Sequence, residues 1–300
     1  VVSRVAAAPM EPRGAVGEWD RRTGRYTLHT GIQHPHALRT LLAEQVFKVP
    51  QSNMHVITGE VGGSFGMKSG AYPEPVLVLW AAKKLGRPVK WTSDRREGFV
   101  TDEHGRDNVS TAELALDANG KFLALRVAIN LNIGAYLTPP SARPGTNNVG
   151  GTAGVYTTPA IHVQTTGLFS NTTPTGPYRG AGRPEATYAI GRVIDVAARG
   201  LKIDPIELRR RNLIPASAMP FKTGLVFTYD CGEFGRGMDM ALGLADWANF
   251  EKRRAEARQR GSAEVIGHRR ANLGGREPVA RHAVAVHHHL DLLPPALTSD

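Results

Sequence analysis

The sequence predicts an α+β fold in which mixed β-sheets pack against helices. Strand-like segments with alternating apolar and polar residues recur along the chain. Two of them, 108–117 and 121–132, are joined by Asp-Ala-Asn-Gly, a strong hairpin signal. Other segments carry apolar residues three and four positions apart, as amphipathic helices do. At 300 residues, the chain can bury a large core in one large or two modest domains.

Local signals place the elements in order. Further strands are expected at 25–29, 54–58 and 88–92 and from Ile161 onward, and helices at 30–46, at 72–86, from Pro184, at 204–212 and at 235–261. A turn at 19–24 precedes the first strand. Pro35 and Asp204 suit the start of a helix, and Gly86 suits the end of a buried one. Residues 137–156, rich in Pro, Gly, Asn and Thr, are expected to form a long loop or lid.

A glycine loop at 59–66 is the most informative segment for function. Glycines 59, 62, 63 and 66 surround Phe65, and this density allows positive φ angles and backbone N–H groups that face an anion. The spacing fits neither the P-loop nor the dinucleotide fingerprint. A plain tight turn is the alternative, but a turn has no need of Phe65, whereas a site that excludes water does.

A second loop repeats the pattern at 171–185. Its glycines surround an aromatic residue and cations: Tyr178, Arg179, Gly180, Gly182 and Arg183. The helix from Pro184 is expected to carry Tyr188, Ile190, Val193, Ile194 and Ala197 on its apolar face. Arg179 and Arg183 could line a site or could serve as structural cations that bond loop carbonyls.

Composition and charge argue against nucleic-acid binding and against a membrane span. The net charge of +10 suggests nucleic acid, but the charge is scattered and its two runs, 209–211 and 252–254, have acidic neighbours. We therefore interpret them as solvated helix faces and expect no nucleic-acid partner, although an anionic cofactor or an acidic partner subunit remains possible. The sequence shows no apolar run of about 18 residues and no signal-peptide layout, which indicates a cytoplasmic protein without a membrane span. The lone Cys231 is interpreted as a structural thiol.

Histidines are interpreted as structural or solvated rather than as metal ligands. His34 and His36 stand two positions apart and cannot share a helix face, so we expect capping or surface roles. Residues 262–300 lack Lys and aromatic residues and contain His287–His289. We interpret this segment as a disordered or poorly packed tail.

Several motifs together carry a resemblance to one family. They are Met10-Glu-Pro-Arg13, Gln33 in Gly-Ile-Gln-His-Pro-His, Gly62-Gly-Ser-Phe-Gly-Met-Lys68, Tyr178-Arg-Gly-Ala-Gly-Arg183, Asp204-Pro-Ile-Glu-Leu-Arg-Arg-Arg-Asn-Leu213 and Tyr229-Asp-Cys-Gly232. In this order they resemble the molybdopterin-binding large subunit of the xanthine dehydrogenase, aldehyde oxidase and aerobic CO dehydrogenase family. The resemblance covers about residues 1–261 and is greatest to the CO dehydrogenase-like branch.

The resemblance implies a cofactor, partners and a reaction. The cofactor would be molybdopterin with molybdenum, in the cytosine dinucleotide form, and the reaction would oxidise an aldehyde or an N-heterocycle with water as the oxygen source. Electrons would leave through an iron–sulfur small subunit and an FAD medium subunit of a hetero-oligomer. Such a protein supplies orientation and electrostatics, while the cofactor carries the chemistry.

The resemblance also assigns residues. Gln33 matches a glutamine that hydrogen-bonds an oxygen ligand of molybdenum; Phe65 and Arg179 match residues that line the metal side. The remaining cofactor-binding positions are Gly62, Gly63, Gly66, Tyr178 and Gly180. No protein side chain is expected to ligate the metal.

Three departures from the family pattern limit the function that the resemblance implies. The copper-ligating cysteine of CO dehydrogenase is replaced by Gly180, which argues against CO oxidation. The family's general-base glutamate has no counterpart in 262–300, and an N-terminal portion is absent. We therefore expect part of the first molybdopterin-binding domain at 1–170, the second loop and the start of the second region at 171–261, and a non-family tail at 262–300. A truncated, non-catalytic fragment is the alternative.

Overall fold

The computed structural model describes residues 1–260, which form two compact units. The first unit comprises 1–110, 128–152 and 163–189. The second comprises 111–127, 153–162 and the residues from 190 on. The predictions for the tail at 262–300 and for His287–His289 lie outside the described residues.

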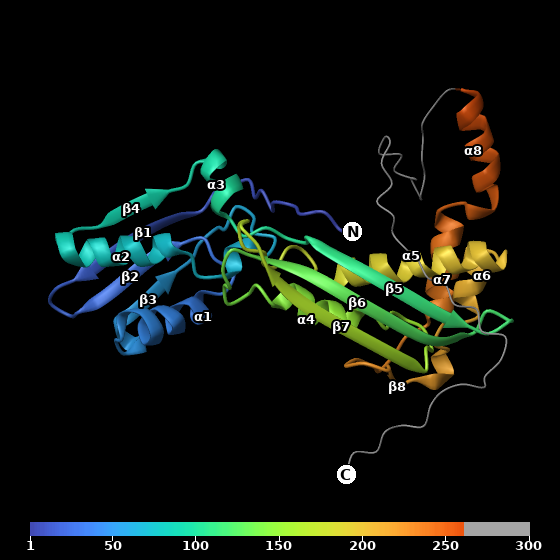
Figure 1. Ribbon diagram of the computed structural model, residues 1–300. Coiled ribbons are helices and arrows are strands. Elements are labelled where there is room, and N and C mark those ends of the chain that lie inside the picture. Colours follow the sequence, from blue (N-terminus) through green and yellow to red (C-terminus); the bar gives the residue numbers. More distant parts are fainter. Residues whose placement is uncertain (261–300) are drawn as a thin grey trace, which may run out of the picture. The chain divides into compact units, whose positions relative to one another are not determined.

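The first unit contains a four-stranded mixed sheet (Figure 1). Its strand order is β3-β2-β1-β4, with β1 at Gly14–Asp20, β2 at Arg25–Thr30, β3 at Met54–Ile57 and β4 at Val89–Thr92. Strand β1 runs antiparallel to β2 and β4, whereas β2 and β3 are parallel. The predicted α+β fold with mixed sheets is therefore confirmed, and so is the hairpin turn, which ends at Gly24 with φ +68°.

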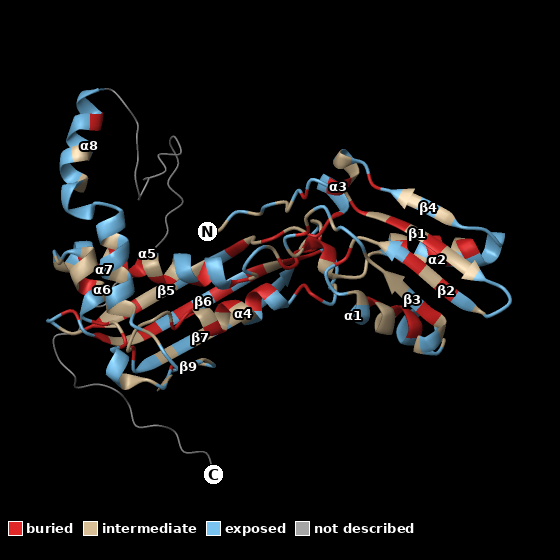
Figure 2. Cartoon of the chain, turned by 180° about the vertical axis from the view of Figure 1, so that it is seen from behind, coloured by how far each residue is buried: buried red, intermediate tan, exposed pale blue. Residues whose placement is uncertain are grey.

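Helix α2 (Pro73–Leu85) packs directly on β1 because Gly17 has no side chain. A Cβ at Gly17 would lie 2.6 Å from the carbonyl carbon of Val78. The helix ends at Gly86 with φ +66°, as predicted. It is amphipathic rather than buried throughout (Figure 2): Val78 and Leu79 face the core, while Leu77 and Trp80 are 57% and 53% exposed.

The segment between β2 and β3 packs against the same sheet. Helix α1 (Pro35–Thr40) begins at Pro35 as predicted and continues into a π-helical stretch, η1 (Leu41–Phe47), after which η2 (Gln51–Asn53) leads into β3. Leu42 and Ala43 are buried against the sheet residues Leu28 and Met54. His34 and His36 are exposed, and His34 stands at the N-cap of α1 without a side-chain capping bond. Helix α3 (Arg95–Thr101), which was not predicted from the sequence, begins after Asp94, whose side chain caps it.

A three-stranded sheet contributes residues to both units, in the order β5-β6-β7. Its strands are β5 (Asn108–Leu116), β6 (Phe122–Gly134) and β7 (Ala160–Phe169), and Gly120 closes the predicted hairpin with φ +79°. The prediction of a loop across 137–156 is wrong in part, because α4 occupies Arg143–Gly151. Poor helix formers build α4, but its glycines allow close packing: a Cβ at Gly145 would lie 3.0 Å from Leu131 of β6.

The remaining helices follow the second loop. Helix α5 spans Arg183–Leu201, and α6 (Pro205–Arg210) is capped by Asp204, which accepts hydrogen bonds from the backbone N–H groups of Ile206 and Glu207, as predicted. Ile190, Val193, Ile194 and Ala197 are buried, but Tyr188 is 55% exposed, so its assignment to the apolar face was wrong. The short elements η4 (Ala216–Ala218), β8 (Phe221–Lys222) and β9 (Thr228–Tyr229) come next.

The prediction of one helix across 235–261 is wrong. The structure has α7 (Phe234–Leu244), η5 (Trp247–Asn249) and α8 (Phe250–Gln259). The break falls at Asp246, whose φ of +46° is incompatible with a continuous helix. Cys231, interpreted as a structural thiol, is exposed. Among the described residues, no helix has the length and apolar character needed to span a bilayer.

Candidate functional site

The first glycine loop adopts a backbone that requires glycine. Gly62, Gly63 and Gly66 have φ angles of +59°, +92° and +103°, in the region that disfavours other residues. Phe65 lies between them with φ +55° and with 44% of its surface exposed. An aromatic residue held at positive φ and exposed to solvent is a local strain that functional sites often contain.

Gln33 is fixed against this loop by its carbonyl oxygen. Its Oε1 accepts hydrogen bonds from the Gly66 backbone N–H, at 2.9 Å, and from the Ser64 hydroxyl. The backbone N–H of Gln33 in turn donates to the Lys68 carbonyl at 2.9 Å. Because a backbone N–H can only donate, the side-chain atom that faces it must be Oε1. The exposed amide of Gln33 therefore directs its two N–H donors away from the loop.

A buried lysine stabilises the first glycine loop through two hydrogen bonds. Lys68 is 2% exposed, and its Nζ donates to Glu11 Oε2 at 2.9 Å and to the Val61 carbonyl at 2.7 Å. Lys68 therefore stabilises the backbone rather than facing a ligand. In the sequence, Lys68 stands out only as the last residue of the Gly62–Lys68 motif. Its partner Glu11 lies 57 residues away, in the Met-Glu-Pro-Arg motif.

The second loop meets the first at Gly66. A Cβ at Gly66 would overlap the Pro177 carbonyl, and the Arg179 backbone N–H donates to the Phe65 carbonyl at 2.8 Å. The Arg179 guanidinium carbon lies 6.0 Å from the centre of the Phe65 ring. The structure thus brings together Gln33, Phe65, Gly66 and Arg179, all within the first unit.

Arg106, for which the sequence predicts no role, holds the second loop in place. Its guanidinium donates to the carbonyls of Tyr178 and Arg179 at 3.0 and 2.9 Å, and it pairs with Glu185 at 3.0 Å. It also lies over the Tyr178 ring, 4.9 Å from its centre. Arg106 thus bonds the loop carbonyls, the structural role that the sequence left open for Arg179 and Arg183. Arg179 itself keeps an exposed side chain.

The remaining predicted positions serve close packing. A Cβ at Gly62 would overlap the Glu11 side chain, and one at Gly63 would lie 3.2 Å from the Phe65 ring. Gly180 has φ +97°, and a Cβ there would lie 2.7 Å from the Pro184 ring. These glycines therefore allow the close packing that shapes the two loops.

The donor set suits an anionic, oxygen-rich ligand. The exposed groups are the amide of Gln33, the guanidinium of Arg179 and the ring of Phe65, and none of the three carries negative charge. A cofactor with phosphate and pterin groups requires hydrogen-bond donors and cations of this kind. In the described part of the chain, no group of three or more His, Cys, Asp or Glu side chains could hold a metal ion.

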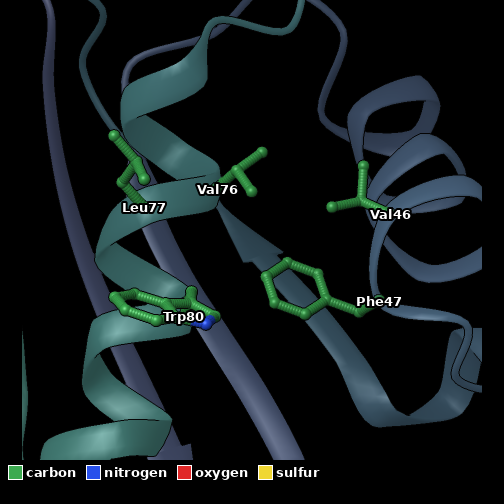
Figure 3. Close-up of a pocket in the computed structure, with 5 residues that line it drawn as sticks. All are labelled: Val46, Phe47, Val76, Leu77 and Trp80. Carbon is green, nitrogen blue, oxygen red and sulfur yellow. The ribbon is translucent and has the colours of Figure 1, made fainter.

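A separate apolar groove lies between α2 and η1 (Figure 3). It encloses about 370 Å³ and is lined by Val46, Phe47, Val76, Leu77 and Trp80. It shares no residue with the two glycine loops, and its lining offers a cofactor little hydrogen bonding.

The family is settled by comparison with known proteins. The sequence model of the molybdopterin cofactor-binding domain matches residues 1–213. The chain belongs to this family. The gamma subunit of the 6-hydroxypseudooxynicotine dehydrogenase complex of Paenarthrobacter nicotinovorans is 36% identical over 284 residues, which are 91% of this chain and 35% of that protein. The carbon monoxide dehydrogenase large chain of Hydrogenophaga pseudoflava is 34% identical over 260 residues, 85% of this chain and 32% of that protein.

Solved structures agree with this membership. The crystal structure of quinoline 2-oxidoreductase from Pseudomonas putida 86 superposes with a TM-score of 0.81 at 34% identity and covers 87% of this chain and 34% of that one. The chain spans about a third of the length of the curated relatives it matches.

Proposed function

We propose that this chain forms part of the active site of a molybdenum hydroxylase, which oxidises an aldehyde or an N-heterocycle with water as the oxygen source. The observation that supports this most is the outward-facing amide of Gln33, fixed beside Phe65 and Arg179 by Gly66 and Ser64. Two relatives, the quinoline 2-oxidoreductase and a nicotine 6-hydroxylase large subunit of Paenarthrobacter nicotinovorans, are named for N-heterocycles, and they favour that substrate class here.

The chain's own residues would bind and orient the cofactor. Bound molybdopterin would supply the redox chemistry and the oxygen transfer. The Nε2 group of Gln33 would donate a hydrogen bond to an oxygen ligand of the molybdenum, because its Oε1 is held by the loop. Phe65 would keep water from one side of the reacting centre, and Arg179 would place a positive charge beside it. Gly62, Gly63, Tyr178 and Gly180 would allow the backbone to approach the cofactor.

The finer assignments belong to the same proposal. The cofactor would be the cytosine dinucleotide form, and an iron–sulfur small subunit and an FAD medium subunit would take the electrons within a cytoplasmic hetero-oligomer. The names of two relatives support an assembly, since one is the gamma subunit of a complex and the other is called a large chain. The division into domains at 1–170 and 171–261 stays a prediction.

Carbon monoxide is not the proposed substrate. Gly180 stands where the resemblance to CO dehydrogenase calls for a copper-ligating cysteine. Its φ of +97° and the adjacent Pro184 ring leave little room for any side chain there. The backbone of the second loop, and not only its sequence, therefore disfavours a thiol at this position.

Replacing Gln33 tests the proposal. In the enzyme that contains this chain, Gln33→Ala should lower turnover roughly 10²-fold, the usual cost of removing one fixed hydrogen-bond donor from an active site. Gln33→Glu is the sharper variant, because it keeps an acceptor for the Gly66 N–H and removes both Nε2 donors. Steady-state kinetics should show the same loss for Gln33→Glu with little change in thermal stability.

The control is Gln45→Ala, an exposed glutamine on η1. It should leave turnover unchanged. Unchanged turnover in Gln33→Glu as well would remove the Gln33 amide from the site.

A further inference from the structure

Glu103 is a buried carboxyl that the proposed mechanism does not use. It is 6% exposed, and within the described part of the chain its Oε2 has no hydrogen-bond partner. It lies in a space that two glycines leave open. A Cβ at Gly176 would overlap the carboxyl, and one at Gly70 would lie 3.5 Å from Oε1. A carboxyl buried without a counter-ion is costly, so its presence calls for a reason.

Gly70 lies just beyond the first loop of the candidate site, and Gly176 lies within the second loop. Gly70 directly follows η3 (Met67–Ser69), with which the first loop ends, and Gly176 directly precedes Pro177 of the second loop. The neighbouring His104 pairs with this part of the second loop: its N–H donates to the Pro174 carbonyl at 3.1 Å, and its carbonyl accepts from Gly176 at 2.7 Å. Glu103 is therefore in contact with both loops at their bases.

Tyr72 connects Glu103 to the first loop a second time. The Tyr72 hydroxyl accepts a hydrogen bond from the Glu103 backbone N–H at 3.1 Å and donates to the Met67 carbonyl at 3.0 Å. Burial, and next the charge of Glu103, raise the pKa of Tyr72, so the phenol remains a donor at neutral pH. Movement of Glu103 would therefore be transmitted to Met67, next to Gly66.

The charged groups near Glu103 already have other partners. Arg13 donates to Asp102 and Glu74 at 2.6 Å each, and the His104 ring lies against Arg4 and the Phe99 carbonyl. Burial raises the pKa of the Glu103 carboxyl to about 7, and the Thr138 hydroxyl and the Arg13 charge oppose this rise. The carboxyl is therefore neutral in mildly acidic solution and becomes charged close to physiological pH.

We propose that Glu103 is a positioning residue: with its proton bound it packs the bases of the two glycine loops together, and as a carboxylate it loosens them. A neutral carboxyl fits the closed space between Gly70 and Gly176, whereas a charged one draws water into it. The geometry of Gln33 and Arg179, and with it the binding of molybdopterin, then weakens as the pH rises. The consequence for the cofactor rests on the proposed function; the behaviour of the loops does not.

Titration of the carboxyl is the first test. In the full chain labelled with ¹³C at glutamate Cδ, the resonance that disappears in Glu103→Gln should titrate with a midpoint near 7. The exposed Glu44, identified in the same way by Glu44→Gln, serves as the reference. A midpoint near 4.5 for Glu103 would overturn the proposal.

Hydrogen exchange of the cofactor-free chain is the second test. The amides of Gly176 and Arg179 should lose protection about tenfold between pH 6 and pH 8, after correction for intrinsic exchange. This follows if opening lets the pKa of Glu103 fall from about 7 to 4.5. In Glu103→Gln, which keeps the neutral shape, protection should not depend on pH; in Glu44→Gln it should fall as in the wild type.

Wild-type protection that stays constant from pH 6 to pH 8 would contradict the proposal without any variant. A pH dependence that persists in Glu103→Gln would contradict it as well. Cofactor content is measured separately. A chain that shows the expected exchange but binds no molybdopterin would refute the proposed function and leave Glu103 as a positioning residue of the loops.

Discussion

Replacing Arg13 by alanine is expected to lower the free energy of unfolding by about 3–5 kcal/mol, because it leaves two carboxylates without their cation in a buried place. Arg13 is 6% exposed and donates to Asp102 and Glu74 at 2.6 Å each. Its guanidinium carbon also lies 3.8 Å from the centre of the Tyr72 ring and 5.2 Å from that of Trp91. Urea unfolding followed by tryptophan fluorescence measures the loss.

The control for Arg13 is Arg21→Ala in the exposed turn between β1 and β2, which should change stability by no more than about 0.5 kcal/mol. If unpaired charge causes the loss, adding Asp102→Asn and Glu74→Gln to Arg13→Ala should recover part of it. A loss below about 1 kcal/mol in Arg13→Ala would show that the network contributes little.

Gly66→Ala is expected to lower cofactor retention at least about tenfold, because the loop cannot keep its backbone with a methyl group there. Gly66 has φ +103°, and a Cβ would overlap the Pro177 carbonyl. To relieve this overlap, the first loop must move away from the second. That movement breaks the Arg179–Phe65 backbone hydrogen bond and shifts the N–H that holds Gln33.

Gly59→Ala is the matched control, since it lies in the same loop and a Cβ there would meet no atom within 4 Å. The ratio of molybdenum to protein after gel filtration should fall in Gly66→Ala and stay at the wild-type value in Gly59→Ala. Equal retention in the two variants would mean that contact between the loops does not shape the site.

Local chemistry explains what the sequence could predict of the fold. The cap at Asp204, the helix end at Gly86 and the hairpin at Gly120 each depend on a few neighbouring residues, so the pattern was sufficient. Helix α4 was missed because its glycines and asparagines are poor helix formers and its stability comes from packing on β6 and β7. The break at Asp246 depends on a single backbone angle that an amphipathic pattern does not reveal.

In the candidate site, too, local motifs could be predicted, whereas contacts between distant residues could not. Gln33, Phe65 and Arg179 were identified from motifs, and the structure places them together. The residues that hold them were not identified, because their partners are distant in the sequence: Lys68 bonds Glu11, and Arg106 bonds Glu185. Glu103 carries no sequence signal at all, since only its burial between Gly70 and Gly176 distinguishes it from an exposed glutamate.

Metal analysis tests the central claim most directly. The 300-residue chain, purified from a host that makes molybdopterin, should contain close to one molybdenum per chain and show pterin fluorescence after the cofactor is released. Gln33→Glu and Gly66→Ala should contain less, and Gly59→Ala the same amount. A wild-type chain that is folded by circular dichroism but contains no molybdenum would contradict the claim that these two loops hold the cofactor.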